Sequence, residues 1–188
     1  GCKFCYAERI TERFGRGKFT DVQLHPDRLD APLRWRKPRR VFVNSMSDLF
    51  HEKVPDLFLG AVFDRMAMAD WHTFQVLTKR PERMCSLLSA WEQDPGAQPR
   101  RTRFANIWLG VSVEDQARAD ERIPVLLQTP ATVRFLSVEP LLGPVDLKLG
   151  RFHIAATGAA AIACEHGYDV CPKCDGMPTL IRWVIVGA

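Results

Sequence analysis

Short apolar runs alternate with amphipathic stretches along most of the chain, and this alternation constrains the fold more than any other feature. The apolar runs are rich in β-branched and aromatic residues: RVFV at 40–43, TFQVL at 73–77, IWLGV at 107–111, VRFL at 133–136 and WVIV at 183–186. Several of these runs are followed by a stretch in which apolar residues recur at helical spacing. Strands that are apolar along their whole length are buried on both faces, as in a parallel sheet joined by helical crossovers. The sequence therefore predicts an α/β fold with a parallel sheet.

A partial barrel of the TIM type is the architecture that we expect, because polar residues gather where many of these runs end. A doubly wound open sheet is the alternative, although no G-x-G-x-x-G turn follows any run, which weakens the case for a dinucleotide site. We expect residues 1–188 to form a single incomplete barrel domain. A small cysteine-containing insertion at 151–179 interrupts the alternation of strands and helices within this domain.

Prolines and apolar spacing predict the helices. Ala7, Ile10 and Phe14 recur at helical spacing, and Pro81 is placed to begin a helix with Met84 on its apolar stripe. Pro55 can occupy the first turn of a helix that runs to about residue 70, whereas Pro124 is expected to break a helix that begins near residue 115.

Composition is that of a water-soluble globular protein of 188 residues, with 46% hydrophobic and 26% charged residues. Neither a secretory pattern nor an apolar run long enough to span a bilayer is present in the sequence. A net charge of +4 permits a nucleic-acid or phosphate partner without requiring one. Most of the six cysteines are clustered, which favours metal over disulfides and predicts a cytoplasmic protein.

The first cysteine pair, Cys2 and Cys5, directly precedes a predicted helix. A C-x-x-C pair in this position suits a zinc knuckle, a redox dithiol or part of an iron–sulfur site. The iron–sulfur interpretation requires a third thiolate, which would have to lie upstream. The spacing alone leaves the three interpretations open.

The segment CKFC has the form of the last two cysteines of the three-cysteine motif of radical-SAM enzymes, in which an aromatic residue commonly precedes the final cysteine. The chain as a whole resembles an uncharacterised phage and bacterial family with a three-cysteine motif. The matching stretches are spread over nearly the whole chain: GCKFCYAE, RVFVNSMSDLFHEKVP, FQVLTKRPERM, NIWLGVSVEDQ, RFLSVEPLLGPVDL and WVIVGA. In that family another cysteine precedes the pair and more chain follows the last strand, so we expect this chain to be truncated at both ends.

The resemblance to radical-SAM enzymes implies a [4Fe-4S] cluster held in part by Cys2 and Cys5. It also implies reductive cleavage of S-adenosylmethionine, which starts radical chemistry on an unknown substrate. In a barrel the strand ends would share one rim with this cofactor. The candidate catalytic residues there are Lys79, Glu114 and Glu139, and the candidate cofactor-binding residues are Asn44, Ser45, Ser47, Asp48, Arg80, Ser112 and Ser137.

Purely structural roles compete with these assignments. Ser47 and Asp48 can cap the turn before a helix, and Glu114 and Asp115 can lie in a first helical turn, where the helix dipole favours acidic residues. His51 and His72 have no partner at ligand spacing in the sequence and are more typical of surface or hydrogen-bonded histidines than of metal ligands.

A second cysteine cluster, CEHGYDVCPKCDG, lies in the insertion and resembles a zinc-ribbon knuckle. Tetrahedral zinc takes four nitrogen or sulfur ligands. The predicted ligands of a structural zinc ion are Cys164, His166, Cys171 and Cys174. His153 is the second choice for the histidine ligand. An auxiliary iron–sulfur cluster and a metal-free loop are the alternatives to the zinc site.

Two basic runs, RWRKPRR at 34–40 and PRRTR at 99–103, each precede a predicted strand and so belong at the edge opposite the rim. This position favours solvated or structural arginines over contact with a phosphate backbone. Two other functions remain as alternatives. One is a metal-independent hydrolase or lyase that uses Glu114 and Glu139; the other is a zinc-stapled nucleic-acid-binding module that uses Arg34, Arg36, Arg39 and Arg40.

Overall fold

The computed structural model describes residues 6–14, 18–93, 104–147, 153–154, 162–163, 181 and 183–186. Its centre is a sheet of five strands, and every neighbouring pair is parallel. The predicted strands are confirmed, with these bounds: β1 (Arg40–Val43), β2 (Thr73–Thr78), β3 (Ile107–Ser112), β4 (Val133–Val138) and β7 (Trp183–Val186).

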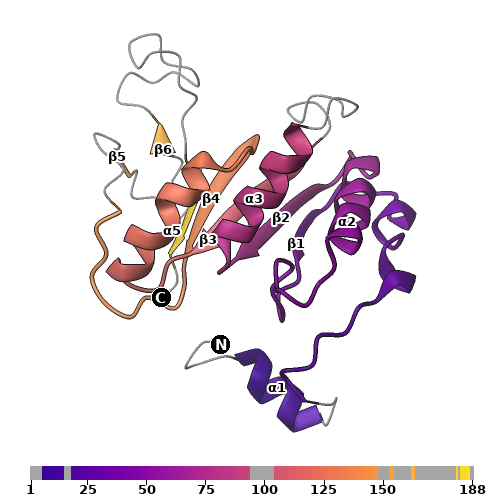
Figure 1. The fold of residues 1–188 in the computed structure, drawn as a ribbon, viewed down its shortest axis with the longest axis horizontal. Coiled ribbons are helices and arrows are strands. Elements are labelled where there is room, and N and C mark those ends of the chain that lie inside the picture. The colour runs from indigo at the N-terminus through magenta and orange to yellow at the C-terminus, as the bar shows by residue number, and fades with distance from the viewer. Residues whose placement is uncertain are drawn as a thin grey trace.

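The strands are neighbours in the order in which they occur along the chain, β1-β2-β3-β4-β7. A doubly wound sheet reverses its strand order at a switch point, whereas a barrel adds each new strand on the same side. The sheet curls as half a barrel does (Figure 1). The partial barrel is therefore the better description of this fold.

Three long helices follow the first three strands and cover one face of the sheet (Figure 1). A fourth helix, α1 (Tyr6–Phe14), lies apart from this layer, on the side of the sheet towards which the strands run. Two 3-10 turns, η1 (Pro26–Arg28) and η2 (Pro32–Arg34), precede β1. The covering helices are α2 (Asp56–Met68), α3 (Pro81–Glu92) and α5 (Gln116–Gln128).

The helix boundaries agree with the sequence except at Pro124. Pro81 is the first residue of α3, as expected, whereas Pro55 is the N-cap of α2, one residue before the first turn in which it was expected. Pro124 was expected to break α5, but the helix continues through it to Gln128. The burial of Ile123 and Leu126, on either side of the proline, holds both halves against the sheet, so the lost backbone hydrogen bond is tolerated.

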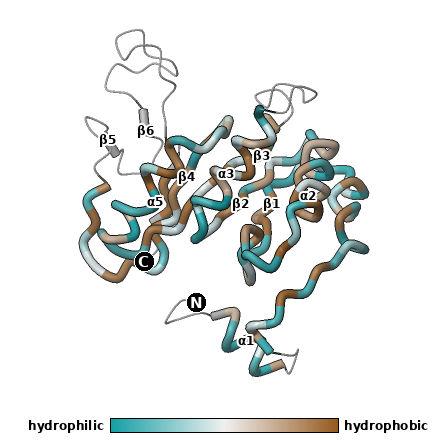
Figure 2. The backbone as a smooth tube through the Cα atoms, viewed as in Figure 1, coloured by the Kyte–Doolittle hydropathy of each residue, from teal (hydrophilic) through white to brown (hydrophobic). Residues whose placement is uncertain are grey.

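The hydrophobic core lies between the sheet and the three covering helices. Phe63 of α2 stacks edge-on against both Trp91 and Phe104, and it is fully buried together with Leu59 and Leu88. Figure 2 shows the hydrophobic residues gathered along the strands, whereas α1 is mainly hydrophilic. Burial of this layer fixes the sheet, and the sheet in turn fixes the positions at which its strands end.

The opposite face of the sheet is packed tightly around Gly110. Gly110 pairs in register with Phe135, whose buried ring lies over it. A Cβ added at Gly110 would come within 2.6 Å of that ring.

We expect Gly110→Ala to lower the free energy of unfolding by about 1–3 kcal/mol, because the buried ring must move to admit the methyl group. Urea denaturation checks this. Gly143, where an added Cβ meets nothing within 4 Å, provides the matched control, Gly143→Ala. Equal effects of the two changes would contradict the packing described here.

A second, two-stranded sheet falls within the predicted insertion. It pairs β5 (His153–Ile154) with β6 (Ile162–Ala163) in antiparallel register. The rest of the insertion lies outside the described residues. Within the part of the chain that the structure describes, none of the helices has the length and apolar character required to cross a membrane.

Candidate functional site

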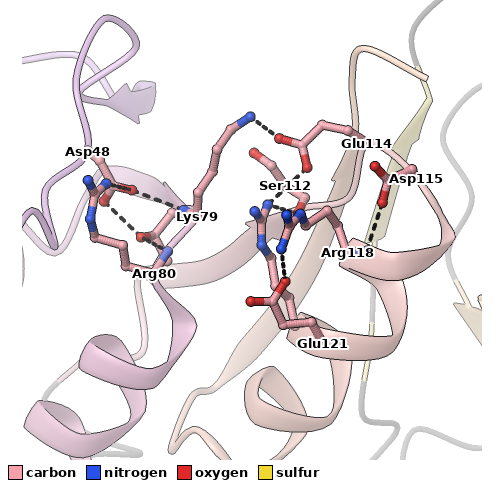
Figure 3. A network of polar contacts seen from close by, with 10 residues as sticks. Asp48, Lys79, Arg80, Ser112, Glu114, Asp115, Arg118 and Glu121 are labelled. Atoms are coloured by element: carbon pink, nitrogen blue, oxygen red, sulfur yellow. Dashed lines mark hydrogen bonds and ion pairs between the residues drawn. The ribbon is translucent and has the colours of Figure 1, made fainter. Parts of the chain in front are cut away.

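Charged side chains gather at the carboxyl edge of the sheet, where β1, β2 and β3 end (Figure 3). Asp48 follows β1, Lys79 and Arg80 follow β2, and Glu114 follows β3. Because neighbouring parallel strands end at the same edge, these residues meet although they are far apart in the sequence. The prediction that they share one rim is confirmed for these four residues.

Asp48 is the hub of one half of this group. Its carboxylate accepts the backbone N–H of Phe50 at 2.9 Å and the hydroxyl of Thr78 at 2.8 Å. It also accepts the backbone N–H of Lys79 and Nη1 of Arg80, both at 3.0 Å. The loop after β1 is thereby fastened to the end of β2. The expected capping role of Asp48 is only a part of what it does.

The second half of the group centres on Glu114, which is 8% exposed. Its Oε1 accepts a hydrogen bond from Nζ of Lys79, and its Oε2 accepts one from Nη1 of Arg122 at 2.9 Å. The same Nη1 donates to the backbone carbonyl of Ser112 at 2.8 Å. A buried carboxylate thus lies between Lys79, which follows β2, and Arg122 of α5.

Arg122 was not among the residues expected at the site. It lies in the interior of α5, is 8% exposed, and its Nε has no hydrogen-bond partner. The sequence did contain a signal for it: Arg122 lies on the same buried face of α5 as the apolar residues Ala119, Ile123 and Leu126. A buried charge requires a counter-charge, and Glu114 provides it.

The other predicted residues fall into two groups. Ser112 and Ser137 are buried neighbours in register on β3 and β4, whereas Glu139 is exposed. Asn44 adopts the left-handed backbone conformation, with a φ of 57°. It is exposed, as are Ser45 and Ser47. The structure therefore brings together the four charged residues that follow β1, β2 and β3, whereas Glu139 and the residues directly after β1 are exposed.

The start of α5 has the structural role that the sequence allowed for it. Asp115 caps the helix by accepting the backbone N–H of Arg118 at 2.8 Å. On the exposed side of the helix, the hydrogen bond from Arg118 to Glu121 raises the pKa of the guanidinium (Figure 3). These residues stabilise α5 without entering the group around Glu114.

His51 and His72 were expected to be surface or hydrogen-bonded histidines, and both form hydrogen bonds with the backbone. His72 is buried and accepts the backbone N–H of Arg39, and His51 accepts the backbone N–H of Lys53. Cys85 is a half-buried free thiol in α3. Among the described residues there is no group of three or more histidine, cysteine or acidic side chains that could hold a metal ion.

The predicted metal ligands cannot be placed, because they lie outside the described residues: Cys2, Cys5, Cys164, His166, Cys171 and Cys174. For His153 only the backbone, in β5, is described. The helix that follows the first cysteine pair, α1, lies beyond the carboxyl edge of the sheet (Figure 1).

The charged group can recognise a ligand that carries both signs of charge. It contains two carboxylates, Asp48 and Glu114, and three cations, Lys79, Arg80 and Arg122. Arg80 and Lys79 are partly exposed, with 39% and 29% of their side chains accessible, and so can turn towards a bound anion. Arg122 is fixed and buried, which suits it to orient Glu114.

Comparison with known proteins identifies one family. The family model described as "Protein of unknown function (DUF5131)" matches residues 1–188. No curated protein and no solved structure matches the chain.

Proposed function

The chain belongs to the DUF5131 family, and from this premise we propose that it is a radical-SAM-like iron–sulfur enzyme acting on an unknown substrate. One observation supports this proposal above the others. The carboxyl edge of a parallel half-barrel carries ionic groups of both signs, and the helix that follows Cys2 and Cys5 lies on that same side (Figure 1).

The chemistry of these groups suits S-adenosylmethionine. Its methionyl part carries an ammonium and a carboxylate, and its ribose carries two hydroxyls. Lys79 and Arg80 are the proposed partners of the carboxylate, while Asp48 and Glu114 are proposed to accept from the ammonium or the ribose. Asn44, Ser45, Ser47, Ser112 and Ser137 supply further polar groups around the same edge.

Cys2 and Cys5 are the proposed ligands of a [4Fe-4S] cluster, which requires at least one further thiolate. When bound, the cluster supplies the electron that cleaves S-adenosylmethionine reductively and so begins radical chemistry on the substrate. The protein's own part is to hold the ligand in place and to exclude water. Arg122 serves this by fixing Glu114, and Asp48 by fixing the loop after β1.

A structural zinc ion at Cys164, His166, Cys171 and Cys174 is a separate part of the proposal. It would stabilise the insertion, which is short for an independent unit. Localisation in the cytoplasm stays a prediction.

Removal of the first cysteine pair tests the enzymatic proposal. We expect the full-length protein, reconstituted without oxygen, to bind iron and sulfide and to form 5′-deoxyadenosine from S-adenosylmethionine after addition of dithionite. Cys2→Ala and Cys5→Ala should each lose most of the bound iron and reduce product formation at least 100-fold, because a cluster site needs at least three thiolates. Iron analysis, absorption spectra and chromatography of the products measure this.

Cys85→Ala is the matched control, since Cys85 is a free cysteine in α3 and is not one of the proposed cluster ligands. It should leave both the iron content and product formation unchanged. A colourless protein that contains only zinc would contradict the proposal. So would a protein whose iron survives Cys5→Ala.

The hydrolase or lyase alternative requires Glu114 and Glu139 as an acid and base pair. Both oxygens of Glu114 are already engaged by cations, and Glu139 is exposed. This arrangement supports a binding or orienting role for Glu114 more than it supports proton transfer. The hydrolase alternative is therefore the weaker of the two.

A further inference from the structure

We infer that residues 34–40, here called the basic segment, bind the phosphate backbone of a nucleic acid. The segment runs from the 3-10 turn η2 into the first residue of β1. It therefore lies at the amino edge of the parallel sheet, opposite the edge that carries Asp48 and Glu114. This inference goes beyond the proposed enzymatic function, because it concerns a different surface.

The backbone of the basic segment is held at several points. The N–H of Trp35 donates to the carbonyl of Pro32 at 3.1 Å, and the indole N–H of Trp71 donates to the carbonyl of Trp35 at 2.8 Å. At the other end, the carbonyl of Arg39 accepts the N–H of Thr73 at 2.9 Å. The segment is irregular in secondary structure, yet its position on the protein is fixed.

His72 is a further residue that holds the backbone of the basic segment in place. It is 1% exposed, and its Nδ1 accepts the N–H of Arg39 at 3.0 Å. The other ring nitrogen, Nε2, must then carry the proton, and it lies 3.1 Å from the carbonyl of Pro32. The ring also packs between Trp35 and Trp71, at centroid distances of 5.7 Å and 5.2 Å. One buried histidine thus contacts the backbone at Pro32, just before the segment, and at Arg39, near its end, and packs against two tryptophan rings.

Four cations of the basic segment have no acidic partner among the residues that the structure describes. Arg34, Arg36, Lys37 and Arg39 are all exposed, and within the described ranges none of them forms an ion pair. Elsewhere in these ranges many cations are neutralised: Arg65 by Asp30, Lys79 by Glu114, Arg80 by Asp48, Arg83 by Asp56 and Arg118 by Glu121. Positive charge is therefore concentrated on the basic segment.

Aromatic side chains lie among these cations. The guanidinium of Arg39 lies over the ring of Trp35, 4.9 Å from its centroid, which fixes the orientation of the cation while its charge stays exposed. Trp71, whose indole N–H donates to the carbonyl of Trp35, is 39% exposed. Clustered cations contact phosphates, and a neighbouring indole can stack on a base, so nucleic acid suits this surface better than a purely anionic partner does.

The test measures binding of the full-length protein to fluorescein-labelled 20-nucleotide DNA, single-stranded and duplex, by fluorescence anisotropy over a series of salt concentrations. The test variant is Arg34→Gln/Arg36→Gln/Lys37→Gln, which leaves Trp35, Arg39 and His72 intact. We expect it to weaken binding more than 10-fold at about 0.1 M salt. The slope of log K against log salt should fall by about 2–3, roughly one for each phosphate that the variant no longer neutralises.

The matched control, Arg9→Gln/Lys18→Gln/Lys53→Gln, removes the same charge from exposed positions outside the segment. It should change the affinity less than about 3-fold, and equal losses in the two variants would show a response to net charge alone and overturn the inference. Absence of binding by the unaltered protein would overturn it as well. So would segment-dependent binding to vesicles rich in phosphatidylserine without binding to DNA. Iron content and cleavage of S-adenosylmethionine should be unchanged in the test variant, which separates this inference from the enzymatic proposal.

Discussion

Replacing Glu114 by alanine is expected to lower the free energy of unfolding by about 3–5 kcal/mol. The reason is the state in which it leaves Arg122. That guanidinium is 8% exposed and already has one nitrogen without a partner. Without Glu114 it would remain charged in the protein interior with only the carbonyl of Ser112 to accept from it. Urea denaturation monitored by circular dichroism measures the change.

Two further variants separate this explanation from a general loss of packing. Glu121→Ala removes an ion pair in which both side chains are 47% exposed, and it should cost less than about 1 kcal/mol. Glu114→Leu/Arg122→Met removes both buried charges and should recover most of the stability lost in Glu114→Ala, since apolar groups of similar volume can replace a buried pair. If the double variant were no more stable than Glu114→Ala, the explanation by an unpaired charge would be wrong.

The sheet was the most predictable part of this structure. Apolar runs such as 107–111 identify buried strands directly, because a strand covered on both faces is apolar along most of its length. The polar residues that end these runs then indicate one functional edge. The order of the strands in the sheet was not encoded in any single run. It follows from the way in which successive right-handed crossovers pack, and it decided between a barrel and a doubly wound sheet.

The contacts within the site were less predictable, since they depend on groups from different elements. The sequence offered Glu114 as a catalytic candidate, but only the packing of α5 against β3 shows that Arg122 holds it. Pro124 is a similar case. The local rule predicts a break, and the buried neighbours on both sides of the proline override that rule.

The basic segment shows the same dependence on tertiary structure. Its sequence favoured solvated arginines, because a run that precedes a strand lies away from the functional edge of a barrel. What the sequence could not show is that His72 and Trp71, more than thirty residues later, attach the segment at several points. An attached row of unneutralised cations has a smaller entropic cost of binding than a mobile one.

Asp48 should be the second position at which a single change has a large effect. We expect Asp48→Ala to lower the free energy of unfolding by about 2–4 kcal/mol, because the backbone N–H groups of Phe50 and Lys79 and the hydroxyl of Thr78 would lose their acceptor at a site where the carboxylate is only 15% exposed. The bond to Arg80 adds less, since that side chain is 39% exposed.

Asp48→Asn is the sharper variant, because it keeps the shape of the side chain. All four groups that contact the carboxylate are donors. An asparagine can offer them only one oxygen, and its NH₂ must face donors in either orientation. We therefore expect Asp48→Asn to lose at least half as much stability as Asp48→Ala. Asp56→Asn, at a carboxylate that is 65% exposed and paired with Arg83, should lose less than about 1 kcal/mol. An Asp48→Asn protein as stable as the unaltered one would mean that the loop after β1 does not depend on this carboxylate, and the charged edge would then lack the rigidity that binding of a small zwitterion requires.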